Sequence, residues 1–85
     1  MSLQTSEQLK AARAACNLTR GQLAELTEQS ERTVSAETVK RLENGKGDLS
    51  ANVSTINTLQ RALESKGIIF IARNGGPAGI RVLEQ

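Results

Sequence analysis

The chain has few of the residues on which most enzymes and metal sites depend. Among 85 residues there is no histidine, tryptophan or tyrosine, one cysteine (Cys16) and one aromatic residue (Phe70). A single cysteine excludes an intrachain disulfide, and without histidine there is no Cys/His zinc site. We find no nucleophile motif, no nucleotide-binding loop and no pair of carboxylates that can be placed in a pocket. The sequence therefore predicts no enzyme, no metal site and no cofactor.

Long apolar stretches are also absent. The longest run of large apolar residues is Ile68–Ile71, and the N-terminus has no apolar signal segment. We therefore expect neither secretion nor membrane spanning, and a cytoplasmic location. With one aromatic residue, the core has to be built from Leu, Ile, Val and Ala, which suits packed helices. At this length a monomer would be marginally stable, so oligomerisation would help.

Start signals predict two helices in the first third of the chain. Residues 5–8 and 19–22 both read Thr-x-x-Gln, the pattern of a capping box. In this motif the Thr oxygen and the Gln side chain satisfy backbone N–H groups that the first helical turn leaves unpaired. Asn17, between the two segments, is expected to end the first helix in the left-handed backbone conformation that Gly usually adopts.

Two further helices and a pair of strands are predicted after that. One helix begins at Ser35 and ends at Asn44, and another spans Asn52 to Lys66. The helical spacing of apolar residues then ends, and β-type runs at Ile68–Ile71 and Ile80–Leu83 flank a connection rich in Gly. The expected fold is mainly α, with about four helices in residues 1–67. Residues 68–85 form a short C-terminal β-hairpin or β extension packed on them, in a single domain.

Three stretches of the chain are similar to a known family. They are L-K-A-A-R-A-A-C-N-L-T-R-G-Q-L-A (residues 9–24), V-S-A-E-T-V-K-R-L-E-N-G-K (34–46) and the tail A-L-E-S-K-G-I-I-F-I-A-R-N-G-G-P-A-G-I-R-V-L (62–83). The first two resemble the phage-repressor/Cro-type (Xre-like) helix-turn-helix family, and the tail resembles the C-terminal extension of a bacterial subgroup of short regulators. The resemblance implies a lambda-repressor-like bundle and a transcriptional regulator, expected to be a repressor. Its helix at 35–44 would enter the major groove of double-stranded DNA.

The resemblance also implies which side chains would meet DNA. Arg41 would donate two hydrogen bonds to guanine, Glu37 would accept one from cytosine, and Ala36 would touch a thymine methyl group. Arg20, at the start of the second helix, would meet a phosphate. In full, the base-contact candidates are Ala36, Glu37, Lys40 and Arg41, and the phosphate-contact candidates are Thr19, Arg20, Ser35, Thr38, Asn44 and Lys46.

Two other residues have structural roles in this interpretation. In the family, the equivalents of Arg13 and Glu43 form a partly buried ion pair between the first and third helices, and we expect the same pair here. Cys16 lies on the apolar side of the first predicted helix, with nothing basic expected beside it except Arg13. A small buried hydrophobic residue is therefore expected there, rather than a redox sensor.

The chain departs from the family motif between Leu26 and Val34. Seven residues separate them, where the family has about two, and the whole stretch Thr27–Thr33 is polar. The extra residues lengthen either the second helix or the turn. If the helix continues, Glu28 and Arg32 have a favourable spacing. We interpret the stretch as a solvated helix end that faces away from DNA, because Glu25, Glu28 and Glu31 would be repelled by phosphates; a partner-binding role is the alternative.

The first predicted strand is apolar on both faces, which is an aggregation hazard unless it is covered. The same element of a second copy is the simplest cover, so we predict a homodimer that would match a palindromic operator. The alternative is a hairpin folded on its own helices. A protein-interaction module with the same fold, antitoxin-like or an adaptor for a partner not yet known, is the second functional hypothesis. The expected dimer interface is Ile68, Ile69, Phe70, Ile71, Ile80 and Val82.

Overall fold

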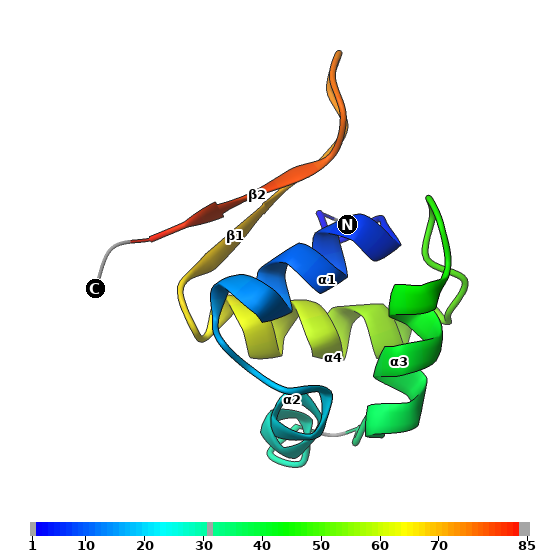
Figure 1. Cartoon of the computed structure of the whole chain (residues 1–85), viewed down its shortest axis with the longest axis vertical. Coiled ribbons are helices and arrows are strands. Elements are labelled where there is room, and N and C mark those ends of the chain that lie inside the picture. The colour runs from blue at the N-terminus through cyan, green and yellow to red at the C-terminus, as the bar shows by residue number, and fades with distance from the viewer. Residues whose placement is uncertain (1, 31, 84–85) are drawn as a thin grey trace.

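Four helices and a two-stranded antiparallel hairpin make up the described part of the chain, which is residues 2–30 and 32–83 of a computed structural model (Figure 1). This agrees with the expected class, mainly helical with a C-terminal β-hairpin. None of these helices is long and apolar enough to cross a membrane. The elements are α1 (Ser6–Ala15), α2 (Arg20–Thr27), α3 (Ala36–Asn44), α4 (Val53–Glu64), β1 (Ile68–Ile71) and β2 (Gly79–Val82).

Each helix begins where its capping residue predicts. Thr5 and Thr19 cap α1 and α2 through complete capping boxes with the glutamine three residues later. Ser35 caps α3 and Asn52 caps α4, each accepting a hydrogen bond from a backbone N–H in the first turn. Asn17 has a φ of 55°, the left-handed conformation expected at the end of the first helix. The predicted start signals are therefore confirmed.

The core is aliphatic and lies between the helices and one face of the hairpin. α2 packs against both α3 and α4, while β1 packs on α4 and β2 on α1 (Figure 1). Phe70 is the single aromatic residue of the core, as the composition requires. The buried apolar residues are Leu3, Leu9, Ala12, Leu23, Val34, Val39, Leu42, Ile56, Leu59, Leu63, Ile68 and Phe70.

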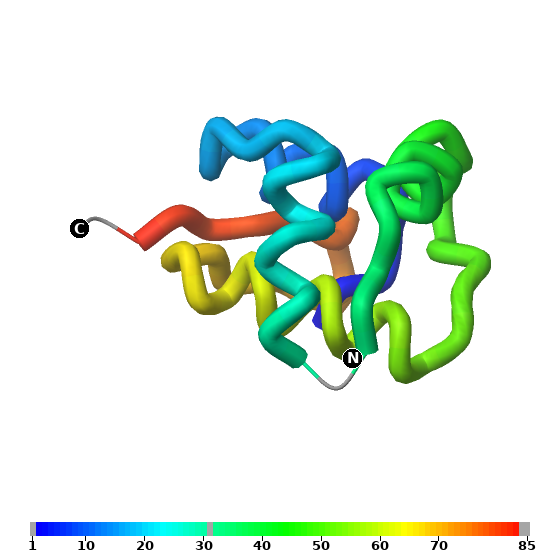
Figure 2. The backbone as a smooth tube through the Cα atoms, turned by 90° about the horizontal axis from the view of Figure 1, so that it is seen from below, coloured from blue at the N-terminus to red at the C-terminus, as the bar shows by residue number. Residues whose placement is uncertain are grey.

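The extra residues between the second and third helices lengthen the turn, not the helix (Figure 2). α2 ends at Thr27, so the condition for a helical pairing of Glu28 with Arg32 is not met. Arg32 instead donates to the Ser54 hydroxyl at 2.7 Å. Thr27 is fully buried and is not part of a solvated helix end. Its hydroxyl accepts a hydrogen bond from the Val34 N–H at 2.8 Å, which joins the two ends of the connection. Glu31, predicted to face away from DNA, lies outside the described residues.

The hairpin pairs within one chain and covers part of its own core. Phe70 is opposite Ile80 and Ile68 is opposite Val82, so these side chains share the inner face. Ile68 and Phe70 are only 2% and 5% exposed, because they pack on the helices of the same chain. They are therefore not available to a second copy, which corrects the expected dimer interface. Ile69, Ile71 and Val82 remain exposed, and Ile80 is partly buried.

Gln8 joins the hairpin to the start of α1. Its side chain is buried, and its Oε1 accepts hydrogen bonds from the backbone N–H groups of Gln4 at 2.7 Å and Thr5 at 3.0 Å. Its Nε2 donates to the carbonyl oxygens of Ile71 at 3.1 Å and Gly79 at 2.9 Å, one in each strand. One side chain thus completes a capping box and fixes the end of the hairpin that adjoins its connecting loop.

The segment before α1 also pairs with the loop that follows α3. Thr5 and Asp48 form an isolated antiparallel bridge, and the Leu49 N–H donates to the Gln4 carbonyl at 2.9 Å. Arg73, just after β1, forms a salt bridge with Asp48. The loop after α3 is therefore held by both the N-terminal segment and the hairpin.

Candidate nucleic-acid interface

α3 separates its residues into one buried and one exposed side. Val39, Leu42 and Glu43 are buried, and the exposed residues are spaced three and four apart along the opposite side. Together with Gly45, these exposed residues line an open hollow of about 540 Å³. We call them the α3 outer face: Glu37, Lys40, Arg41 and Asn44.

The charged side chains of the α3 outer face make no strong hydrogen bonds or ion pairs with the rest of the described residues. Arg41 donates to the Ser50 carbonyl at 3.4 Å, which is a long hydrogen bond. Within residues 2–30 and 32–83, the Glu37 and Lys40 side chains have no hydrogen-bond or ion-pair partner. Ala36, the fourth base-contact candidate, is half-buried in the first turn. The structure therefore brings the four candidates onto one helix and leaves three of them exposed.

The expected phosphate contacts fall into three groups. Thr19, Ser35 and Thr38 are at helix N-termini, where Ser35 accepts from the Thr38 N–H at 3.2 Å while the two hydroxyls are 3.0 Å apart. Asn44 and Lys46 are exposed at the C-terminal end of α3. Arg20 is placed differently, since its Nε donates to Glu43 at 3.2 Å.

Glu43 is the buried centre of an ion triad, with two partly exposed arginines, that fixes α3 on the other two helices. Its side chain is fully buried and accepts from Arg13, with Nε–Oε2 at 2.6 Å and Nη2–Oε1 at 2.9 Å. The ion pair expected between these residues is present, and Arg20 adds a third member from α2. Arg13 also donates from Nη1 to the Leu18 carbonyl at 2.8 Å. The triad holds α3 with its outer face toward solvent.

The pKa values of Glu43 and Arg13 reflect this arrangement. Burial alone would raise the pKa of Glu43, but hydrogen bonds and charges from Arg13 and then Arg20 outweigh it and hold this pKa below its ordinary value. The hydrogen bonds that Arg13 donates to Glu43 raise the pKa of Arg13. Both groups are therefore charged at neutral pH, which keeps the bidentate pair intact.

Lys10 is a candidate that sequence reasoning missed. It lies on α1 and lines a hollow of about 320 Å³ with Asn44 and Lys46. The loop after α3 is close to α1 because the Ser6 N–H donates to the Gly47 carbonyl at 2.9 Å. No sequence signal marks Lys10, since it is one of several polar residues on the solvent side of its helix.

Cys16 is half-buried, and its surroundings differ in one respect from the expectation. Burial raises the pKa of its thiol, and the positive charge of Lys66 lowers this pKa to a smaller extent. A basic residue other than Arg13 therefore does lie near the thiol. The net rise in pKa keeps the thiol protonated at neutral pH, which suits a packing role.

The described residues thus place an exposed, mixed-charge helix face beside cationic side chains from α1 and the loop after α3. The helix itself is fixed from behind by the core and by the ion triad. Comparison with protein families, with curated proteins and with solved structures gives no match for this chain.

Proposed function

We propose that this protein is a sequence-specific DNA-binding transcriptional regulator, acting as a repressor, that inserts α3 into the major groove. The observation that carries the proposal is the α3 outer face, which is exposed on a helix whose other side is rigidly held. The major groove of B-DNA is about 12 Å wide and admits one such helix. A guanidinium, a carboxylate and an amide on that face are groups that distinguish base pairs by hydrogen bonding.

Specific roles follow for three side chains of the α3 outer face. Arg41 donates two hydrogen bonds to guanine, because its contact with Ser50 is long and exchangeable. Glu37 accepts from a cytosine amino group and is repelled by phosphate wherever that base is absent. Lys40 contributes a second cation beside Arg41.

In the proposal, residues that contact phosphates lie on either side of α3. Lys46 lies just beyond α3, and Lys10 shares its hollow from α1. Unpaired N–H groups at the start of α2 add a favourable dipole. These contacts set the register and much of the affinity, and they make binding weaker as salt rises. A homodimer would present two copies of α3 to a palindromic site.

The test is selection from a randomised duplex pool followed by fluorescence-anisotropy titration at two salt concentrations. Wild type is compared with Arg41→Ala and with Arg61→Ala, a matched control that removes an exposed arginine from α4. We expect a recovered palindromic site and a steep salt dependence. Arg41→Ala should lose discrimination at one base pair, by roughly 10- to 100-fold, while Arg61→Ala keeps it.

Binding that is absent at low salt, or equal for all sequences and unchanged in Arg41→Ala, contradicts the proposal. An antitoxin-like or adaptor module would then be the better hypothesis. The observation favouring it is the exposed apolar surface of the hairpin, which suits a protein partner.

A further inference from the structure

The hairpin exposes an apolar surface on the side that faces away from the core. Ile69 and Ile71 are each 41% exposed and Leu83 is 49% exposed. Of the five large hydrophobic side chains that are exposed in the described residues, these three lie on the outer side of the hairpin, and Val82 lies on its inner side. Such concentration of apolar surface in a small protein is typical of an interface. We call the surface formed by Ile69, Ile71, Arg81 and Leu83 the hairpin outer face.

Arg81 places one cation within that apolar surface. It is directly opposite Ile69 in the strand register, so the two side chains point to the same side of the hairpin. Within the described ranges the Arg81 side chain has no ion-pair partner. A partner that covers the hairpin outer face must therefore offer apolar contact and a carboxylate together.

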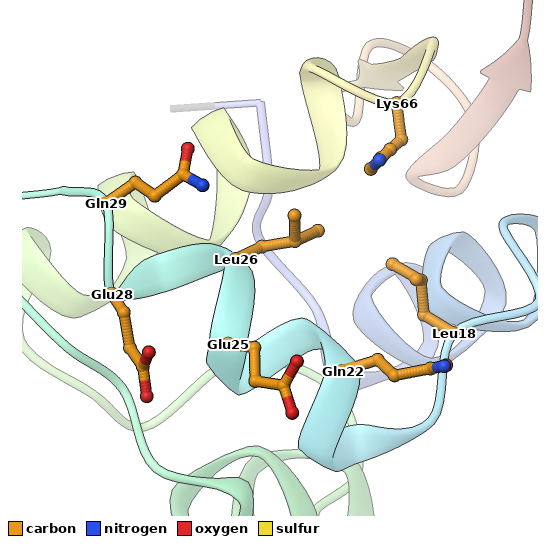
Figure 3. Close-up of a pocket in the computed structure, with 7 residues that line it drawn as sticks. All are labelled: Leu18, Gln22, Glu25, Leu26, Glu28, Gln29 and Lys66. Carbon is orange, nitrogen blue, oxygen red and sulfur yellow. The ribbon is translucent and has the colours of Figure 1, made fainter.

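The same chain offers such a surface along α2. A hollow of about 580 Å³ lies between α2 and the C-terminal end of α4, and Leu18 and Leu26 extend into it (Figure 3). Glu25 and Glu28 line the α2 side of the hollow, and both are exposed. We call this surface the α2 groove: Leu18, Gln22, Glu25, Leu26, Glu28, Gln29 and Lys66.

We propose that the hairpin outer face of one copy docks into the α2 groove of a second copy, and the reverse, in a two-fold symmetric dimer. The isoleucines and Leu83 cover Leu18 and Leu26, and Arg81 meets the carboxylates of Glu25 and Glu28. Under two-fold symmetry each hairpin fills the groove of the other copy, so the contact closes at two subunits. This inference deepens the proposed function and rests on its homodimer component.

Charge complementarity selects this arrangement over a face-to-face contact of two hairpins. A face-to-face contact would bring Arg81 of each copy into the same apolar region with no carboxylate on either hairpin outer face, and buried like charges oppose association. Docking in the groove instead brings the cation to a surface with two carboxylates, Glu25 and Glu28, and one ammonium group, Lys66, so negative charge is in excess there. The contact uses no residue of the α3 outer face, so DNA reading and dimerisation remain separate.

Sedimentation equilibrium of three versions of the full chain tests the proposal. The first is wild type, the second is Arg81→Glu, and the third carries Glu25→Arg and Glu28→Arg. All three positions are exposed, and circular dichroism checks that each variant folds. Wild type should dimerise, and each variant alone should dissociate roughly 100-fold more readily, because like charges then meet at both contacts.

Mixing the two variants tests most directly whether Arg81 pairs with Glu25 and Glu28. In the mixture, the carboxylate introduced by Arg81→Glu in one copy meets the guanidinium groups introduced on the α2 groove of the other. At the second contact, the unchanged Arg81 meets the unchanged Glu25 and Glu28. We therefore expect a heterodimer with near wild-type affinity.

Three results would overturn the docking proposal. A wild-type dimer that Glu25→Arg with Glu28→Arg leaves unchanged, while Arg81→Glu alters it, would favour face-to-face hairpins. Unchanged association in both variants or a monomeric wild type would exclude the contact altogether. Arg41→Ala, measured in parallel, should dimerise normally. Failure of the dimer is therefore distinguishable from failure of DNA reading.

Discussion

Two buried polar residues, Glu43 and Gln8, fix the two parts of the molecule that present outward surfaces. Glu43 is charged and holds α3 through two guanidinium groups, whereas Gln8 is neutral and holds the hairpin through backbone groups. Every buried side-chain nitrogen and oxygen in the described residues has a partner. The chain therefore solves the same problem, fixing an element against the core, once with charge and once without it.

The difference teaches where the molecule is sensitive to conditions. A buried ion triad is stable only while its members stay charged, and removal of one member leaves another charge unpaired. A buried amide does not titrate, and its removal costs only the hydrogen bonds that it makes. We expect α3 to respond to pH, and the attachment of the hairpin to be insensitive to it.

The largest effect is expected from Glu43→Ala. This change leaves the partly buried Arg13 without its carboxylate, and it should lower the free energy of unfolding by about 3–5 kcal/mol. Urea denaturation followed by circular dichroism measures it. Glu37→Ala, on the exposed side of the same helix, is the control and should change stability by no more than about 0.5 kcal/mol. Equal costs for the two changes would show that the triad does not stabilise the fold.

Gln8→Ala should have the next largest effect, about 2 kcal/mol, because it removes the partners of the buried Thr5 N–H and of the partly buried Gly79 carbonyl. Amide hydrogen exchange should accelerate in β1 and β2 more than in α3. The matched control is Gln22→Ala, which removes the equivalent glutamine of the exposed capping box at Thr19. If Gln22→Ala destabilises the protein as much, the contact with the hairpin contributes nothing beyond capping.

Acid should weaken the Glu43 triad and leave the Gln8 cluster unchanged. The pKa of Glu43 is lower in the folded chain than its ordinary value of 4.5, so its contribution to stability is complete above that value. The contribution is lost as the pH falls through the lower, folded-state pKa. Urea denaturation from neutral pH to about pH 3 should therefore show a shallower loss of stability in Glu43→Gln than in wild type. In Gln8→Ala, stability should fall with pH as steeply as in wild type. If stability falls as steeply in Glu43→Gln as in wild type, Glu43 is not the group responsible.

The smallest effect is expected from Arg73→Ala, which breaks the salt bridge that joins the hairpin connection to the loop after α3. Both side chains are at least half exposed, so the cost should be about 0.2–1 kcal/mol at low salt and should shrink at high salt. Thermal unfolding at two salt concentrations measures it. A loss that does not depend on salt would indicate that the Arg73 stem packs rather than pairs.

Local features were predicted from the sequence more completely than long-range ones. Thr5, Thr19 and Ser35 act within their own first turns, so their short motifs are sufficient to place the helix starts. The second role of Gln8 could not be predicted, because the carbonyl groups of Ile71 and Gly79 reach it only through the tertiary fold.

The same limit applies to the candidate site. The exposed residues of α3 follow from helical spacing, and the Arg13–Glu43 pair came from the family resemblance. Arg20 was expected at a phosphate because it lies at the start of a helix. Its contact with Glu43 could not be predicted, since the sequence does not give the distance between α2 and α3. Ile68 and Phe70 were assigned to a dimer because a strand that is apolar on both sides does not reveal which side its own helices cover.

The hydrogen bond between Thr27 and Val34 makes the connection between α2 and α3 a place where chain length is free to vary. Because the two ends are joined at the core, residues between them are not needed to set the distance between the helices. Each doubling of such a loop costs about 0.6 kcal/mol in closure entropy. A peptide tag or a fluorescent reporter inserted there, beyond Gln29 of the α2 groove, should leave the packing of α3 unchanged.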